Sequence, residues 1–260
     1  MPRFLNITLL ALACLTLCVT QLAFGEFVTV HASQSATLYS EDANGANGSG
    51  QYLFAGRTNQ GFTRRAIVRF DLGGLPPDAL LLSARVSMNV AQGNGGVRPM
   101  SLHRSLQDWT TGASDPSGTE SVGVAATMGD CTWAWASSNG AMGGTPWAQA
   151  GGSFQSIASA TSSTTVMGMQ SWMSANLFAD VEAWLANPSE NFGWFLLGDE
   201  SAVGTTRRLD SAHPIAGGFP PSLEIEYSIV PAPGALVLLS IAGLVMSRRK
   251  RRMNLPVREL

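Results

Sequence analysis

The chain has 260 residues; 28 of them are glycine and 13% are charged. Between residues 26 and 229, nine arginines stand against seventeen acidic residues, a net charge of about −8, and six of the other seven basic residues follow Ser247. Because binding to phosphates requires a basic surface, this acidic body excludes a nucleic-acid-binding protein. The body has a single cysteine, Cys131, which we expect to be buried as a small apolar side chain.

The first 25 residues have the pattern of a secretory signal peptide. Arg3 precedes an apolar run that continues to Val19, and the small-x-small sequence AFG ends at Gly25. These are the charged, hydrophobic and cleavage regions of a signal helix, so residues 1–25 predict export of the chain and cleavage after Gly25.

The segment EDANGANGSG, residues 41–50, is rich in oxygen ligands. A calcium loop of the EF-hand type starting at Asp42 needs glycine at its sixth position and glutamate at its twelfth, where this sequence has Asn47 and Leu53. We therefore expect a polar hairpin loop without a metal. Irregular binding of calcium by Asp42, Asn44 and Asn47 is the alternative.

Alternation of apolar and polar residues predicts antiparallel strands along the body. In SARVSMNV, the residues Ala84, Val86 and Met88 share one face, and RRAIVRFDL and SLEIEY alternate in the same way. Turns rich in glycine and proline separate these runs, as in GNGG at 93–96. The pattern predicts an all-β fold, a jelly-roll-like antiparallel β-sandwich over residues 26–229.

One short helix is expected within LFADVEAWLANP, residues 177–188. Phe178, Val181 and Trp184 fall on one face of such a helix, and the Asn-Pro sequence at its end stops it. The segment 112–174 is rich in small and polar residues, so we expect long loops there with two strands.

A short apolar segment followed by basic residues lies near the end of the sequence. Residues 235–247 are apolar or small; thirteen helical residues span about 20 Å, less than the roughly 30 Å of a bilayer core. The basic residues that follow are Arg248, Arg249, Lys250, Arg251 and Arg252. They predict a C-terminal transmembrane helix with its end in the cytoplasm and the body outside.

The sequence directly before this helix is Val230-Pro231-Ala232-Pro233-Gly234. Together with the helix and the basic residues, it resembles the PEP-CTERM sorting tail of exported bacterial proteins, with Ala232 in place of glutamate. The resemblance implies that an exosortase-type membrane protease recognises residues 230–252, cuts near Pro233-Gly234 and releases the body to the cell surface or extracellular matrix. A plain membrane anchor is the alternative. Residues 253–260 form a further short tail.

Several landmarks follow one another in the body. They are RRAIVRFDLGGLPPDALLLSARVSM, SLHRSLQDWTTG, CTWAW, ADVEAWLANPSENFGWFLLGDE, TTRRLDS and PPSLEIEY. Their order resembles the DNRLRE domain, a β-sandwich of secreted bacterial proteins that is related to some carbohydrate-binding modules. The resemblance covers residues 28 to 227, and it implies a single sandwich domain.

The sequence lacks the common motifs of catalytic sites. It has no G-x-S-x-G elbow and no P-loop, and none of its three histidines has a partner at metal-ligand spacing. Glycosidases need only two carboxylates about 5–10 Å apart. Here the carboxylates that could form such a pair are Asp71, Asp108, Asp180, Glu182, Asp199, Glu200 and Asp210. Asp71 and Asp210 follow Arg69 and Arg208 by two positions, which predicts surface ion pairs. We predict no enzymatic activity; a polysaccharide-active enzyme is the alternative.

Tryptophan side chains are the best candidates for a contact with sugar. Trp133 and Trp135 share a face if TWAWA is extended, and Trp147 lies in a glycine-rich loop nearby; these three are the candidates for a stacking platform, and core packing is the alternative. Core packing is expected for Trp184 and Trp194. The acidic body favours a neutral or weakly charged glycan as ligand. A purely structural or adhesive role in the matrix is the alternative.

Overall fold

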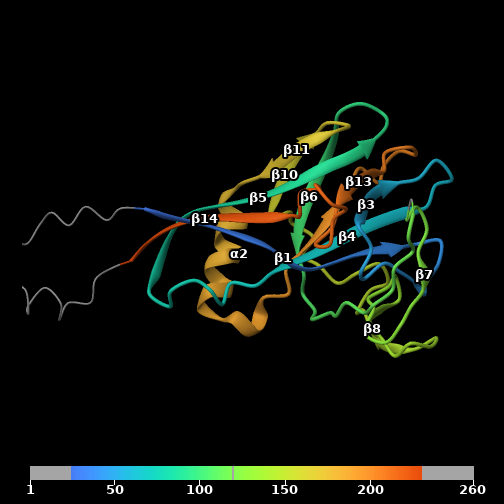
Figure 1. Ribbon diagram of the computed structural model, residues 1–260, viewed down its shortest axis with the longest axis horizontal. Helices are drawn as coiled ribbons and strands as arrows, with labels where there is room; N and C mark the ends of the chain where they lie inside the picture. The colour runs from blue at the N-terminus through green and yellow to red at the C-terminus, as the bar shows by residue number, and fades with distance from the viewer. Residues whose placement is uncertain (1–24, 119, 230–260) are drawn as a thin grey trace, which may run out of the picture. The chain divides into compact units, whose positions relative to one another are not determined.

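A computed structural model describes residues 25–118 and 120–229 of the chain (Figure 1). The chain divides into two compact units, and the larger comprises Glu26–Pro77 and Leu81–Tyr227. No helix within the described ranges is long and apolar enough to cross a membrane. The predicted signal peptide and the predicted transmembrane segment lie outside the described residues.

Within the described residues the fold is all-β with one short α-helix, as the sequence predicted. The strands are β1 (Glu26–Tyr39), β2 (Gly45–Ala46), β3 (Tyr52–Arg57), β4 (Thr63–Phe70), β5 (Ala79–Gly93), β6 (Arg98–Arg104), β7 (Val124–Ala125), β8 (Trp135–Ser138), β9 (Gly144–Pro146), β10 (Ala160–Thr164), β11 (Gly168–Trp172), β12 (Trp194–Leu197), β13 (Arg207–Asp210) and β14 (Ser222–Ile229). The helix is α2 (Ala175–Ala186), and a 3-10 turn, η1 (Pro188–Glu190), follows it.

Six strands close into a barrel. The first part of β1 pairs with β14, starting with Glu26 opposite Tyr227. The second part pairs with β4, starting with Ala32 opposite Phe70, and has an irregularity between Ala32 and Gln34. The order β1-β14-β5-β13-β3-β4 therefore returns to β1, while β12, β6 and β10 extend from β4, and β11 extends from β5. These pairings do not show the separate sheets of a jelly-roll sandwich. Alternation predicts which residues face the core, but it leaves open which strands pair at the corners.

Helix α2 begins and ends two residues before the predicted segment. The Ser174 hydroxyl accepts a hydrogen bond from the Leu177 amide nitrogen at 3.1 Å and so caps its first turn. The buried side chains of α2 are Leu177, Asp180, Val181 and Trp184. Leu177 therefore takes the core position that was predicted for Phe178. Trp184 packs on Trp194 with ring centroids 4.4 Å apart, which confirms that both are core residues.

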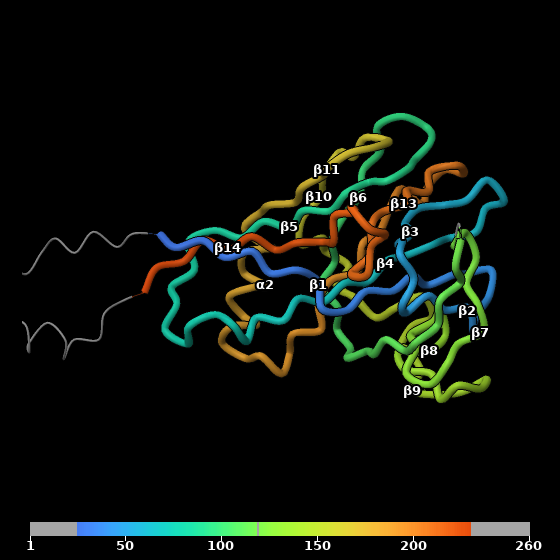
Figure 2. The backbone as a smooth tube through the Cα atoms, in the orientation of Figure 1, coloured from blue at the N-terminus to red at the C-terminus, as the bar shows by residue number. Residues whose placement is uncertain are grey.

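The segment between β6 and β10 is built mainly of loops, which Figure 2 shows gathered around β8 and β9 beside β2 and β7. Residues 112–174 contain five short strands where two were predicted. Asp130, which is fully buried, organises this segment: its carboxylate accepts bonds from the Gly112 and Thr127 amides and from the Ser114 hydroxyl. Cys131 next to it is buried as predicted, and burial raises the pKa of its thiol.

Candidate functional site

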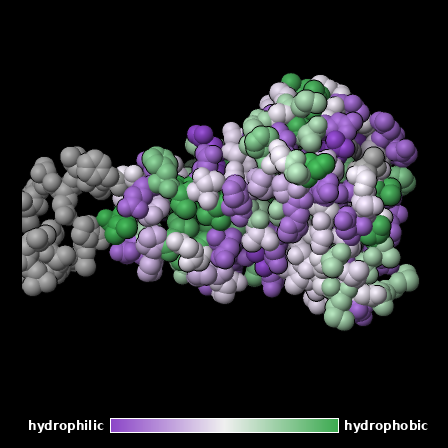
Figure 3. All heavy atoms as spheres, in the orientation of Figure 1, coloured by the Kyte–Doolittle hydropathy of each residue, from purple (hydrophilic) through white to green (hydrophobic). Residues whose placement is uncertain are grey.

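A cavity of about 680 Å³ opens on the surface where β3, β4, β5 and β13 run side by side. This volume lies within the roughly 300–1,000 Å³ that is typical of small-molecule sites. The residues that line it include Glu41, Phe54, Phe62, Arg64, Thr206 and Arg208. Figure 3 shows one face of the molecule, on which hydrophobic residues form separate groups among hydrophilic ones.

The floor of the cavity contains a fixed ion pair. Nη2 of Arg64 lies 2.5 Å from Oε1 of Glu41, and both side chains are largely buried. The guanidinium of Arg64 also lies 5.2 Å above the ring of Tyr39 and 5.6 Å from the ring of Phe54. Two rings and a carboxylate therefore hold the cation in place. The second carboxylate oxygen of Glu41, Oε2, is buried and has no hydrogen-bond partner.

A second arginine of the cavity is not paired with an acid. Arg208 lies with its guanidinium 4.2 Å from the ring centroid of Tyr52, and it forms no ion pair within residues 25–118 and 120–229. Its Nε atom is buried without a partner, as is Oγ1 of Thr206. In the described residues eight buried side-chain polar atoms lack a partner, and three of them belong to this cavity. Each unpaired group costs about 1–3 kcal/mol, so their concentration points to a ligand or ordered water.

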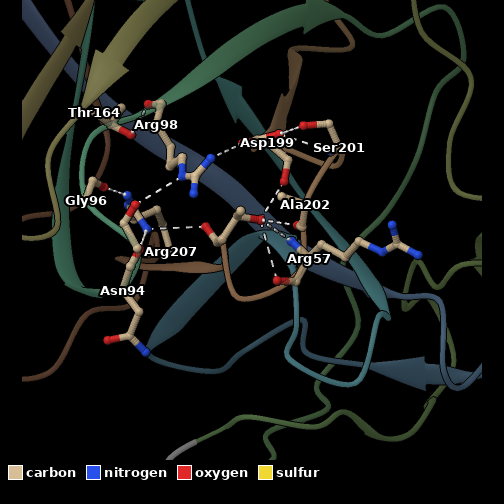
Figure 4. Close-up of polar contacts among 11 residues, drawn as sticks. Arg57, Asn94, Gly96, Arg98, Thr164, Asp199, Ser201, Ala202 and Arg207 are labelled. Carbon is tan, nitrogen blue, oxygen red and sulfur yellow. Dashed lines mark hydrogen bonds and ion pairs between the residues drawn. The ribbon is translucent and has the colours of Figure 1, made fainter.

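A buried arginine, Arg207, lies next to residues that line the cavity. Figure 4 shows the Arg207 guanidinium among main-chain carbonyl groups. It donates to the oxygens of Asn94 and Gly96, to that of Thr165 at 3.1 Å and to that of Thr205 at 3.3 Å. Removal from water lowers the pKa of Arg207. Its bonds join the loop after β5 to the start of β13, and both segments line the cavity.

A partly buried ion pair also supports this loop. Nη1 of Arg98 lies 3.1 Å from Oδ2 of Asp199, and Nε of Arg98 donates to the carbonyl of Gly95. The hydroxyl and amide of Ser201 donate to Oδ1 of Asp199, and these bonds are the main reason that the pKa of Asp199 is lowered. Arg98 and Arg207 thus both donate hydrogen bonds to the loop after β5, which contributes to the cavity lining.

The three predicted platform tryptophans lie apart from the cavity. Trp147 is buried in the core and packs on Phe195, with ring centroids 5.4 Å apart. Trp133 is half-buried, and the guanidinium of Arg65 lies 5.1 Å from the centroid of its ring. Trp135 is half-buried, and its indole nitrogen donates to a side chain of the 41–50 loop. Protein groups therefore occupy much of the surface of these rings.

The proposed calcium ligands take part in hydrogen bonds of their own loop. Oδ1 of Asp42 accepts from the Asn44 amide, and Oδ1 of Asn44 accepts from Trp135 at 2.9 Å. The Asn47 amide donates to the buried carboxylate of Glu120 at 3.2 Å. Within the described residues, no three histidine, cysteine, aspartate or glutamate side chains are placed to hold a metal ion.

The carboxylates that could have formed a catalytic pair are mostly bound to separate partners. Asp108 pairs with Arg69, Asp180 with Arg104, Asp199 with Arg98, and Glu200 with Arg65; Glu182 lies exposed on α2. The two ion pairs predicted from spacing are wrong. Asp71 lies beyond the end of β4 and accepts from the Gly73 amide, and Asp210 accepts from Asn89 and from the Phe219 amide.

The predicted sorting residues lie outside the described residues. They are Val230, Pro231, Pro233 and Gly234, with Arg248, Arg249, Lys250, Arg251 and Arg252 after the apolar segment.

Sequence reasoning did not find the cavity, because its lining comes from four strands and five loops that are far apart in the chain. The one local signal was TTRRLDS, where Thr206 and Arg208 alternate with the buried Arg207. No family model matches the chain, and no curated protein is significantly similar to it in sequence.

Proposed function

We propose that this chain is an exported, non-enzymatic protein of the cell surface or extracellular matrix whose β domain binds a glycan. The observation that carries this proposal is the cavity, where Glu41, Thr206 and Arg208 each contribute a buried polar atom without a partner. These atoms are closed off from water, so a sugar reaches them only when the lining side chains shift; its hydroxyl groups, which both donate and accept, would then satisfy all three.

The cavity has the mixture of groups that a pyranose ring needs. Oε2 of Glu41 accepts a hydrogen bond, Nε of Arg208 donates one, and Oγ1 of Thr206 does either. Phe62 at the rim is 43% exposed and offers an apolar ring to the carbon face of a sugar. The acidic charge of the body favours a neutral or weakly charged glycan, such as a strand of extracellular polysaccharide.

The acidic residues that line the cavity support the proposal that the protein is not an enzyme. A glycosidase uses two carboxyl groups, whereas Glu41 is the one acidic side chain among the described residues that line the cavity. Oε1 of Glu41 is also bound to Arg64. No group in this set of lining residues is placed to act as its catalytic partner.

We propose that the barrel is a variant of the jelly-roll-like sandwich of DNRLRE domains. In this description β1 and β3 belong to both layers, because β1 pairs with β14 and β4, and β3 pairs with β13 and β4. The order of landmarks in the sequence supports the proposal.

Export and sorting rest on the sequence of the two ends. We propose that the signal peptide 1–25 is removed and that residues 230–252 hold the chain in the membrane until an exosortase-type protease cuts near Pro233-Gly234. Mass spectrometry of the extracellular protein tests this directly. Recovery of membrane-bound chains that all end at Leu260, with none released, would instead indicate a plain anchor.

A glycan array probed with the full-length protein tests the binding proposal. Phe62→Ala and Thr206→Val are expected to weaken binding to neutral glycans about tenfold or more, since each removes a ring contact or a hydrogen bond in a desolvated site. Phe219→Ala is the matched control, because Phe219 is 58% exposed and does not line the cavity.

Three outcomes would reject the proposal in different ways. Binding that all three variants retain would place the site elsewhere. Binding to polyanions alone, lost at moderate salt, would remove the neutral-glycan assignment. Release of reducing ends from a polysaccharide by the wild-type protein would show an enzyme.

A further inference from the structure

The body contains four Asn-Gly sequences. They are Asn44-Gly45, Asn47-Gly48, Asn94-Gly95 and Asn139-Gly140. At such a pair the main-chain nitrogen of the glycine can attack the side-chain carbonyl carbon of the asparagine, because glycine has no Cβ to obstruct the approach. Sequence alone treats the four pairs as equivalent. The structure distinguishes them by the hydrogen bonds of the attacking nitrogen.

In three of the pairs the glycine N–H already has an acceptor. The Gly45 nitrogen donates to the Asp42 carbonyl at 3.0 Å. The Gly48 nitrogen donates to the Ser114 hydroxyl at 3.0 Å, and the Gly140 nitrogen donates to a serine hydroxyl at 3.1 Å. Attack by any of these nitrogens first requires the loss of its hydrogen bond.

The asparagine side chains of the same three pairs are also held. Oδ1 of Asn44 accepts from the Trp135 indole, and Oδ1 of Asn139 accepts from the Ala141 amide at 3.0 Å. Asn47 is 2% exposed, and its Nδ2 donates to three acceptors. These side chains cannot turn toward the neighbouring nitrogen without breaking contacts.

Asn94-Gly95 differs in each of these respects. Asn94 is exposed, and neither its side chain nor the Gly95 nitrogen forms a hydrogen bond with any of the described residues. Gly95 and Gly96 have φ values of 77° and 73°, a region that favours glycine and so marks a turn without side chains to crowd it. Both reacting groups at this pair are therefore free.

A neighbouring cation also favours the reaction at this pair. Nη1 of Arg207 donates to the carbonyl oxygen of Asn94, which belongs to the same peptide unit as the Gly95 nitrogen (Figure 4). When that nitrogen loses its proton, negative charge spreads onto this oxygen. A buried guanidinium at hydrogen-bond distance stabilises that charge.

We propose that Asn94 is a site of spontaneous deamidation. Solvent base removes the proton of the Gly95 nitrogen, which forms a bond to Cγ of Asn94; Nδ2 takes a proton from water, the bond from Cγ to Nδ2 breaks, and ammonia leaves. Water then opens the resulting five-membered imide at either carbonyl and leaves an aspartate or an isoaspartate. Asn94 lines the cavity, so the product adds a negative charge to a lining that also contains Arg208 of β13.

The test is peptide mapping by mass spectrometry of the folded full-length protein after incubation at mildly alkaline pH. Conversion at Asn94 is expected to be at least about tenfold faster than at the other three pairs, because each of those first loses at least two hydrogen bonds, one of the glycine nitrogen and one of the asparagine side chain; tenfold corresponds to about 1.4 kcal/mol. Chromatography of the same peptide is expected to resolve an aspartate and an isoaspartate form.

Two controls separate the effect of structure from that of sequence. In protein unfolded in urea the four pairs are expected to react at similar rates, and Asn94→Gln is expected to remove the modified peptide from folded protein. An unmodified Asn94 after complete reaction of the unfolded sample would overturn the proposal. So would equal rates at the four pairs in folded protein, or the same preference for Asn94 in the unfolded chain.

Discussion

The guanidinium of Arg207 on β13 donates a hydrogen bond to the carbonyl oxygen of Asn94 in the loop after β5. A buried cation with main-chain carbonyls as its only partners is unusual, because removal from water is normally offset by a carboxylate. Here four hydrogen bonds from Arg207 to main-chain carbonyls offset the loss of water in place of a carboxylate. Some of them connect two segments that line the cavity. The site therefore depends on a side chain that does not face it.

We predict that Arg207→Lys lowers the free energy of unfolding by about 1–3 kcal/mol, because an ammonium group cannot reach four carbonyls in the geometry of a planar guanidinium. Urea denaturation of the full-length protein measures the change. Arg208→Lys is the control: its side chain only stacks on Tyr52, so its effect is expected to stay within about 1 kcal/mol. Equal losses in the two variants would contradict the role given to Arg207.

The second prediction concerns the carboxylate of Asp130. Asp130→Asn places an NH2 group against N–H and O–H donors, since both carboxylate oxygens accept bonds from them. A loss of about 1–3 kcal/mol in the free energy of unfolding is expected. Asp115→Asn, at an exposed carboxylate in the same segment, is expected to change little. Chemical denaturation followed by tryptophan fluorescence compares the two.

The third prediction is a dependence on pH. Hydrogen bonds from Ser201, together with Arg98, lower the pKa of Asp199 below its usual value. The ionised form is then favoured in the folded state, so Asp199 stabilises the fold at neutral pH and loses this effect as the pH falls below about 4. Asp199→Asn is expected to be less stable than wild type at neutral pH, with the difference shrinking at acidic pH.

Denaturation of both proteins across the acidic range checks this dependence. Ser201→Ala removes the largest cause of the shift, so in that variant the pKa of Asp199 is expected to rise toward its usual value, as an NMR titration of the carboxyl group would report. A stability difference between wild type and Asp199→Asn that stays constant with pH would count against the assignment.

The fourth prediction uses two glycines with similar backbone angles. Gly152 has a φ of 107° and Gly168 a φ of 102°, so alanine introduces comparable backbone strain, about 1–2 kcal/mol, at each position. A Cβ at Gly152 would lie 2.3 Å from ring carbons of Phe195 in the core, while one at Gly168 would meet nothing. Gly152→Ala is therefore expected to destabilise the fold by about 1–3 kcal/mol more than Gly168→Ala does. Thermal unfolding of the two variants measures the difference.

Alternation in the sequence predicted the longer strands β4, β5 and β14 and their inner faces, whereas residues 112–174 form five short strands where two were predicted. Ala84, Val86 and Met88 all lie buried on β5, as the period of two required. Closure of the barrel could not be predicted in this way, because it depends on β1 changing partners near Gln34, and no local pattern encodes a partner. For the same reason Arg69 was assigned to Asp71, whereas its acid is Asp108, 39 positions away.

The candidate site was harder to predict than the fold. Tryptophans are the obvious candidates for sugar binding in a sequence. In the structure, however, Trp147 packs in the core, and an arginine lies over the ring of Trp133. The groups that define the cavity are common polar residues, such as Thr206, and what distinguishes them is the lack of a partner. That property exists only once the chain has folded.

The pairing of Glu26 with Tyr227 brings the first and last residues of the larger unit side by side, with a hydrogen bond of 2.9 Å between their side chains. A domain whose two ends meet needs only a short connection to join them, so it is suited to insertion into a surface loop of another protein and to circular permutation. Joining the strands at this point and opening the chain in the β8–β9 turn is expected to leave the barrel intact.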